Sequence, residues 1–92
     1  MENRKEGRSK PNQIATVQVL GLRPGPVVSA SILDISGSGM RLRSKLPAPC
    51  GASIEIKTNN MVAQGRVSRC DPKQGFYELG VQVSKMAPAP KS

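Results

Sequence analysis

Apolar and polar residues alternate with a period of two along most of this chain. The clearest case is residues 53–57, where two isoleucines alternate with serine, glutamate and lysine. This period places successive side chains on opposite faces of a β-strand, whereas a helix repeats about every 3.6 residues. The same alternation predicts five further strands, at residues 13–20, 27–35, 40–43, 61–69 and 77–83. No segment has the spacing of a convincing helix, so the sequence predicts an all-β protein.

Glycine, proline and asparagine separate these segments. Residues 21–26 and 47–51 each combine glycine with proline, and Asn59–Asn60 favours a tight hairpin. Gly65 predicts a bulge or bend within its strand. Six short strands with a turn about every 8–12 residues indicate a small antiparallel barrel or sandwich. A closed barrel would also leave no unprotected sheet edge, so our predicted fold is a six-stranded antiparallel β-barrel.

The chain divides into three parts. Residues 1–12 are polar and basic, and we predict a flexible arm that becomes ordered on binding. Residues 13–84 contain all the predicted strands, and a chain of 92 residues has room for one modest core. Residues 85–92 are predicted to be a short tail, because Pro88 and Pro90 prevent a long helix. The sequence contains neither an internal repeat nor a second domain.

Positive charge dominates the composition. Fourteen Lys and Arg residues against six Asp and Glu residues give a net charge of +8. An anionic partner is the first expectation, and a surface that merely keeps the protein in solution is the alternative. No apolar run approaches the roughly 20 residues that a membrane-spanning helix needs, so no membrane insertion is expected. The polar N-terminal residues lack the apolar region of a secretory signal, and we expect a cytoplasmic protein.

The chain has no histidine and two cysteines, Cys50 and Cys70. The cysteines lack the short spacing of metal ligands, and we expect half-buried free thiols in a reducing compartment. A disulfide between them stays open as an alternative. A general base near neutral pH would have to be a carboxylate, a lysine or a cysteine. Asp34 is the only such group beside a serine in a turn, and no partner base is visible for Ser36 or Ser38, so we expect no catalysis, metal or cofactor.

Two groups of polar residues stand out from the regular pattern. Arg4 and Arg8 lie in the basic arm, and Asp34, Ser36 and Gly39 lie where a predicted strand runs into a tight turn. Two guanidinium groups facing a carboxylate, a hydroxyl and open backbone suit a ligand that carries phosphates and purine edges. Each group also has a purely structural explanation. The arginines can be ordinary charges of an arm, and the turn residues can serve only their own backbone.

Arg4 and Arg8 form an Arg-x-x-x-Arg motif, and Asp34, Ser36 and Gly39 form an Asp-x-Ser-x-x-Gly motif. These two motifs, in this order and on an all-β pattern of this length, resemble those of the PilZ domain. The similarity covers residues 2 to about 83, and segments 65–67 and 79–81 also resemble strands of that family. PilZ domains are bacterial receptor modules for cyclic di-GMP and form six-stranded barrels of the split-barrel type. The resemblance therefore implies the fold that the alternation predicts, together with cyclic di-GMP as ligand.

The resemblance also implies a role for each motif residue. Arg4 and Arg8 would fold over the ligand and bind guanine edges or phosphates through their planar forks. Asp34 would accept hydrogen bonds from the N1–H and N2–H2 groups of guanine, and Ser36 would donate to a phosphate or base acceptor. Gly39 would permit a backbone conformation or a close approach that a Cβ would block. Losing one arginine should weaken binding by about one to two powers of ten.

The chain departs from the family pattern in two respects. Many relatives carry a helix after the last strand, for which the proline-containing tail leaves little room. Lys5 stands where a second consecutive arginine is common, and lysine keeps the charge but loses the fork. On the barrel itself, Arg41, Arg43 and Arg66 could add phosphate contacts, although a solvated strand face explains them equally well.

The leading hypothesis is a receptor or adaptor module that binds cyclic di-GMP and changes its surface to signal to a partner protein. The ligand contacts would have to exceed the entropy lost when the arm becomes ordered. A barrel without ligand binding that acts as a protein-interaction module is the alternative. A basic barrel that binds RNA or single-stranded DNA ranks last, because Phe76 and Tyr77 are the only aromatic residues and at most one can face outward.

Overall fold

Six antiparallel β-strands make up the structure, a computed structural model that describes residues 13–21 and 23–89. The strands are β1 (Gln13–Val19), β2 (Val28–Ser36), β3 (Gly39–Ser44), β4 (Ser53–Lys57), β5 (Met61–Pro72) and β6 (Tyr77–Pro88). The all-β prediction is confirmed. This part of the chain contains no helix, and hence none long and apolar enough to cross a membrane. The predicted arm, with Arg4 and Arg8, lies outside the described residues.

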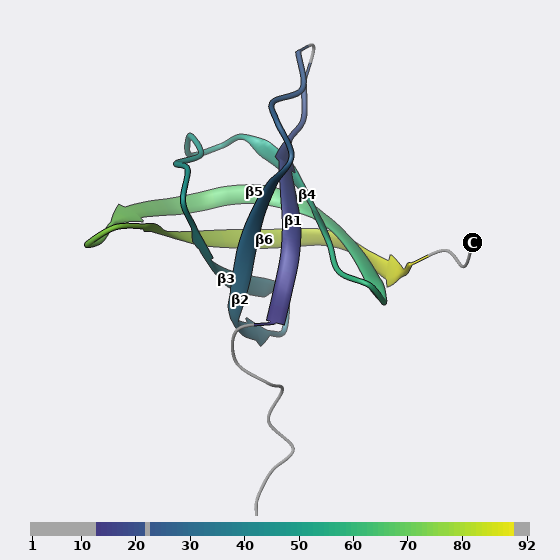
Figure 1. Ribbon diagram of the computed structural model, residues 1–92. Helices are drawn as coiled ribbons and strands as arrows, with labels where there is room; N and C mark the ends of the chain where they lie inside the picture. Colours follow the sequence, from purple (N-terminus) through teal and green to yellow (C-terminus); the bar gives the residue numbers. More distant parts are fainter. Residues whose placement is uncertain (1–12, 22, 90–92) are drawn as a thin grey trace, which may run out of the picture.

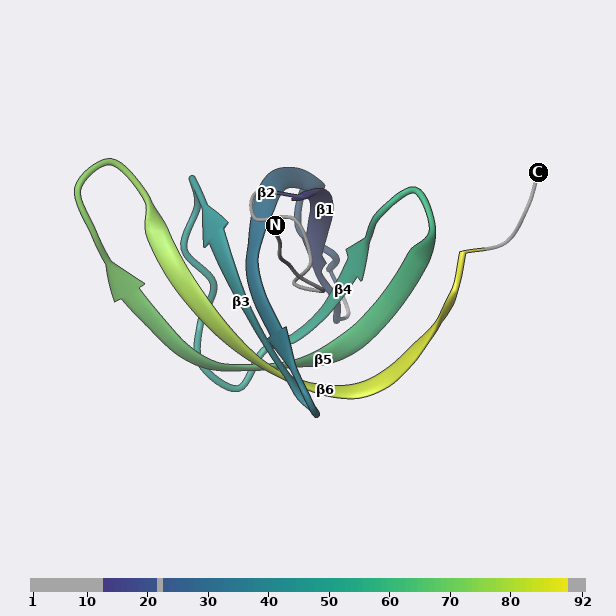
Figure 2. The ribbon, with the colours of Figure 1, turned by 90° about the horizontal axis from the view of Figure 1, so that it is seen from below.

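The strands close into a barrel in the order β1-β2-β3-β6-β5-β4, and β4 pairs with β1 to complete it. Figure 1 shows β1 and β2 crossing the long strands β5 and β6. Figure 2 shows the β5–β6 ribbon bent into a trough below β1 and β2. The predicted six-stranded antiparallel barrel is therefore confirmed, and closure removes free sheet edges along most of its strands.

The barrel encloses a small aliphatic core. Its buried residues come from all six strands and from the loop before β4, and they are Ala15, Val17, Ala30, Ile32, Met40, Leu42, Ala48, Ile54, Ile56, Ala63, Val67, Leu79 and Val81. Ser44 is the only buried polar residue in the described chain. Its hydroxyl donates to the carbonyl of Leu46 at 2.8 Å and accepts from the amide of Leu46 at 3.1 Å. The one buried hydroxyl is therefore satisfied, and apolar burial stabilises the rest.

β6 runs further than the alternation predicted. It ends at Pro88, whereas the sequence placed a tail from residue 85, and β5 likewise continues to Pro72. β3 pairs with β6 only as far as Gln82, so the last part of β6 is a sheet edge. Proline is tolerated at an edge because its missing N–H costs no ladder hydrogen bond there. The strand thus continues into residues that the sequence assigned to the tail.

The β5–β6 pair changes register at Gly65, as the sequence predicted. Gln64 pairs with Lys85 and Gly65 with Val83, which leaves Ser84 of β6 as the extra residue. A Cβ at Gly65 would overlap the carbonyl oxygen of β6 that faces it. Only glycine therefore allows the two strands to approach this closely.

Candidate ligand-binding groove

The β2–β3 hairpin carries three of the predicted site residues. Asp34 and Ser36 lie at the end of β2, and Gly39 opens β3 and pairs with Ser36. Gly37, in the turn between them, has a φ of +47°, a left-handed conformation that favours glycine. A Cβ at Gly39 would make only ordinary contacts, the nearest at 3.6 Å. The special backbone conformation belongs to Gly37 rather than to Gly39, which leaves close approach of a ligand as the role expected of Gly39.

A β-bulge turns Asp34 towards the outer surface of the barrel. Buried Ile32 of β2 pairs with buried Leu42 of β3. The next pair along is Asp34 with Arg41, so Leu33 is the extra residue of a bulge. Strict alternation would have pointed Asp34 into the core, because side chains two residues apart in a strand share a face. The bulge reverses this direction and leaves the Asp34 side chain 52% exposed.

A second bulge acts in the same way on β5. Val67 pairs with Val81 inside the barrel, and the next pair along is Arg69 with Gly80. Ser68 is therefore the extra residue, and the side chain of Arg69 points outward with 64% of its surface exposed. The hydroxyl of Ser68 donates to the carbonyl of Gly80 at 3.1 Å. This hydrogen bond ties the bulge to β6.

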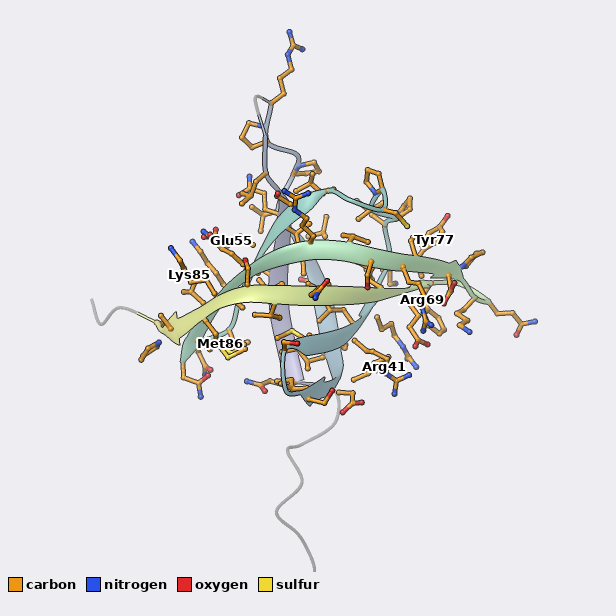
Figure 3. The ribbon with its side chains drawn as sticks, turned by 180° about the vertical axis from the view of Figure 1, so that it is seen from behind. Arg41, Glu55, Arg69, Tyr77, Lys85 and Met86 are labelled. Atoms are coloured by element: carbon orange, nitrogen blue, oxygen red, sulfur yellow. The ribbon has the colours of Figure 1, made fainter. Side chains whose placement is uncertain are left out.

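Together the two bulges align four outward-facing residues across neighbouring strands. In cross-strand order they are Asp34, Arg41, Gly80 and Arg69, which we call the outer row. Neighbouring strands lie about 4.8 Å apart, so the backbones of Arg41 and Arg69 are about 10 Å apart, on either side of Gly80. Glycine has no side chain, so the surface between the two arginines stays open. Figure 3 shows both arginines towards one end of β6, away from the end that carries Lys85.

Three carboxylates hold these arginines in ion pairs, and only that of Glu78 is largely shielded from solvent. Arg41 donates from Nη1 to Oε2 of Glu78 at 2.9 Å, and its Nε lies 3.7 Å from Oδ2 of Asp34. The Nε of Arg69 lies 3.4 Å from Oδ2 of Asp71. Exposed pairs of this kind stabilise a protein by only about 0–1 kcal/mol. Arg69 can therefore exchange Asp71 for a ligand phosphate at little cost, whereas the side chain of Glu78 is only 17% exposed and holds Arg41 in place.

The outer row borders a shallow groove of about 270 Å³ on the barrel surface. Asp34, Ser36 and Gly39 line it from β2 and β3, and Ser68 and Arg69 line it from β5. The structure thus brings the three predicted turn residues together at one open site. A carboxylate, hydroxyl groups and guanidinium groups meet there. An open groove with cationic walls suits a polar anionic ligand laid across the strands rather than an enclosed apolar molecule.

β1, which follows the N-terminal arm in the sequence, begins beside this groove. Gln13, the first described residue, pairs with Ile32 of β2, just before Asp34. Figure 1 shows that β1 begins at the same end of the barrel as the β2–β3 turn. Arg8 precedes Gln13 by five residues, which span at most about 18 Å when extended. The groove is therefore within reach of the arm, whose arginines Arg4 and Arg8 lie outside the described residues.

Sequence reasoning missed Arg69, Gly80 and Glu78 as members of this site. Arg69 lies two residues after buried Val67, so strict alternation would point its side chain into the core. The sequence offered one local signal of a bulge. Arg69 is a charged residue at a position that alternation assigns to the core, and the strand opposite it contains glycine. The alignment of Arg69 with Gly80 and Arg41 depends on the register of three strands, and no single strand shows it.

Of the three barrel arginines considered for phosphate contacts, only Arg41 lines the groove. The guanidinium of Arg43 lies 4.3 Å from the centre of the Phe76 ring, a cation–π contact. Arg66 lines a different depression, together with residues of β4 and β6. The two latter arginines therefore belong to other parts of the surface.

The described chain offers few groups for other chemistry. Both cysteines are free thiols, as predicted, although Cys50 is exposed rather than half-buried and only Cys70 is partly buried. Within residues 13–21 and 23–89, no three His, Cys, Asp or Glu side chains lie close enough together to hold a metal ion. The outer row and its groove are therefore the strongest candidate site.

Comparison with known proteins identifies the family of this barrel. The family model described as PilZ domain matches residues 2–92, essentially the whole chain. Neither the search of curated proteins nor the search of solved structures gives a significant match. PilZ domains as a family are binding and adaptor modules for cyclic di-GMP.

Proposed function

The chain belongs to the PilZ domain family, and on that basis we propose that it is a receptor for cyclic di-GMP. The observation that carries the proposal is the outer row, which two bulges align beside the entry of the arm. Cyclic di-GMP presents two phosphates and two guanine edges. The groove offers guanidinium groups for the phosphates and a carboxylate for a guanine.

Each groove residue has a distinct task in this proposal. Asp34 accepts hydrogen bonds from the N1–H and N2–H2 groups of a guanine, a pairing that adenine cannot satisfy. Arg41, held by Glu78, faces a phosphate, and Ser36 donates to a phosphate or base acceptor. Gly80 keeps the surface open so that the ligand can lie close to the backbone of β6.

The arm closes the site in this proposal. Arg4 and Arg8 cover the ligand and bind guanine edges or phosphates through their planar guanidinium groups. Ordering a residue costs about 1–2 kcal/mol of backbone entropy, so the ligand contacts must offset this cost before the arm can close. Ligand binding is thereby linked to a change in the surface of the protein.

The proposed output is a protein–protein contact rather than a reaction. The ordered arm and the bound nucleotide present a new surface to an effector protein, and the receptor itself needs no catalytic group or cofactor. We place this activity in the bacterial cytoplasm, where cyclic di-GMP acts as a second messenger.

Isothermal titration calorimetry with cyclic di-GMP, GTP and a short single-stranded oligonucleotide tests the proposal. We expect binding of cyclic di-GMP alone. Arg8→Ala and Asp34→Ala should each raise its dissociation constant at least about tenfold, because each removes a contact worth about 1–3 kcal/mol. Arg23→Ala removes the same charge from the β1–β2 loop, at the other end of β2 from Asp34, and should leave the dissociation constant unchanged.

The other outcomes point to the competing functions. Binding of the oligonucleotide without cyclic di-GMP would indicate a nucleic-acid-binding barrel, which the lack of aromatic residues other than Phe76 and Tyr77 disfavours. Absence of binding to all three ligands would indicate a protein-interaction module that has lost its ligand.

A further inference from the structure

A second groove runs across the outer surface of β1, β2 and β3. Its volume is about 320 Å³, and we call it the docking groove. Ile14 and Leu46 line it and are 65% and 46% exposed, although both are large apolar residues. Scattered apolar residues are ordinary on a protein surface, but two that share one depression mark a candidate interaction site.

The floor of the docking groove is accessible to another chain. Ser29 and Ser31 of β2 line it, and their short side chains leave the strand uncovered. Phe76 also lines the groove, with one face of its ring under the guanidinium of Arg43. Apolar side chains of a partner can therefore pack between Ile14, Leu46 and the remaining ring surface.

The charged residues that line the docking groove have a single sign. Arg43 and Lys45 line it, and no Asp or Glu among residues 13–21 and 23–89 does. Both cations are exposed. A second copy of this chain would bring the same cations together, and the arm carries four cationic residues against two acidic ones. Like charges facing each other disfavour both of these occupants, whereas a carboxylate-bearing segment complements the groove.

We propose that the docking groove binds an acidic segment of a partner protein, one that alternates carboxylate and aliphatic side chains. The carboxylates pair with Arg43 and Lys45, and the aliphatic side chains contact Ile14 and Leu46. This inference goes beyond the proposed function, because docking of such a segment requires no nucleotide. The groove nevertheless adjoins the nucleotide site, since Arg43 and Arg41 lie on the same face of β3.

Selection of short random peptides by the full-length protein, without nucleotide, tests this inference. We expect the selected peptides to be rich in Asp and Glu and to contain aliphatic residues. Their affinities are then measured by fluorescence anisotropy with the synthetic peptides. Leu46→Ser and Lys45→Glu should each raise the dissociation constant by about tenfold, through lost apolar contact and reversed charge respectively.

Matched controls separate docking from general effects of charge and folding. Arg66→Glu makes the same change of charge as Lys45→Glu, on β5 and outside the docking groove, and should leave the affinity within about twofold. A repeat selection with the Arg43→Glu/Lys45→Glu double variant should yield basic rather than acidic peptides. Lys45 is exposed and outside the core, so its single substitution remains informative should the double variant fail to fold.

Several results would overturn the inference. Enrichment of no peptide, or of peptides without acidic residues, would exclude the stated partner chemistry. So would acidic peptides whose affinity falls equally in Arg66→Glu and Lys45→Glu. A dimer detected by sedimentation and dissociated by Leu46→Ser would assign the groove to a second copy. A more than tenfold gain in peptide affinity on removal of residues 1–11 would assign it to the arm. Cyclic di-GMP binding is measured separately, so failure here leaves the receptor proposal standing.

Discussion

Leu33 and Ser68 each add one residue to a strand, and each thereby changes the face on which the next charged side chain lies. Under strict alternation Asp34 and Arg69 would point into an aliphatic core, where an unpaired charge costs several kcal/mol. The bulges place both side chains in water instead. The charges themselves therefore favour the bulged register, and the same bulges create the candidate site.

At this scale we predict that Arg69→Ala weakens cyclic di-GMP binding. Arg69 stands across Gly80 from Arg41, so its loss removes one cationic wall of the groove. The dissociation constant should rise about tenfold, and binding should become less sensitive to salt because one charge contact is gone. Calorimetry at two salt concentrations measures both effects. An affinity equal to that of the unaltered protein would show that Arg69 does not contribute to ligand binding.

Among the elements, the long β5–β6 pair does most to set the shape of the barrel and the groove. Each is twelve residues long, and they pair with each other beyond the parts that β3 and β4 cover. The ribbon bends where Gly65 meets the backbone of β6, beside the extra residue Ser84. The bend lets one ribbon both close the barrel and carry one side of the groove.

We predict that Gly65→Ala destabilises the barrel. The new Cβ would overlap a backbone carbonyl of β6, so the strands must separate, and the free energy of unfolding should fall by about 1–3 kcal/mol. Chemical denaturation followed by circular dichroism measures the change. Gly39→Ala is the matched control, because a Cβ there meets only ordinary contacts and should alter stability by less than about 0.5 kcal/mol. Equal stability of the two variants would contradict this account of the bend.

In the whole molecule, different residues form the core and the candidate site. Every buried core residue of the described chain lies between Ala15 and Val81, within the barrel. The groove residues lie on the outer surface of the same strands. The described core and the groove therefore use opposite faces of the same strands.

Removal of residues 1–11 should accordingly leave the barrel folded and abolish cyclic di-GMP binding. The denaturation midpoint should stay the same, because every residue of the described core remains. Binding should fall below detection, because Arg4 and Arg8 are both lost. Circular dichroism and calorimetry on the same sample measure the two properties. Retained affinity would show that the barrel groove binds the nucleotide without the arm.

The sequence predicted the local features of this protein well. The period of two located all six strands, and the bounds of residues 53–57 agree with β4. The bend at Gly65 was also predicted correctly. The extension of β6 to Pro88 was not predicted, because the end of a strand depends on how far its neighbouring strand continues beside it. Arg69 was missed for a related reason, since its outward direction depends on the pairing of β5 with β6.

By itself, the sequence determined that the chain forms strands, which residues are apolar enough to fill a core, and which motif residues are present. These are local properties, because the direction of a side chain along a regular strand follows from the backbone alone. Only the tertiary structure decided that Asp34 and Arg69 face the same groove as Arg41. A bulge is defined by two strands together, and the register between strands distant in the chain is set when the barrel closes.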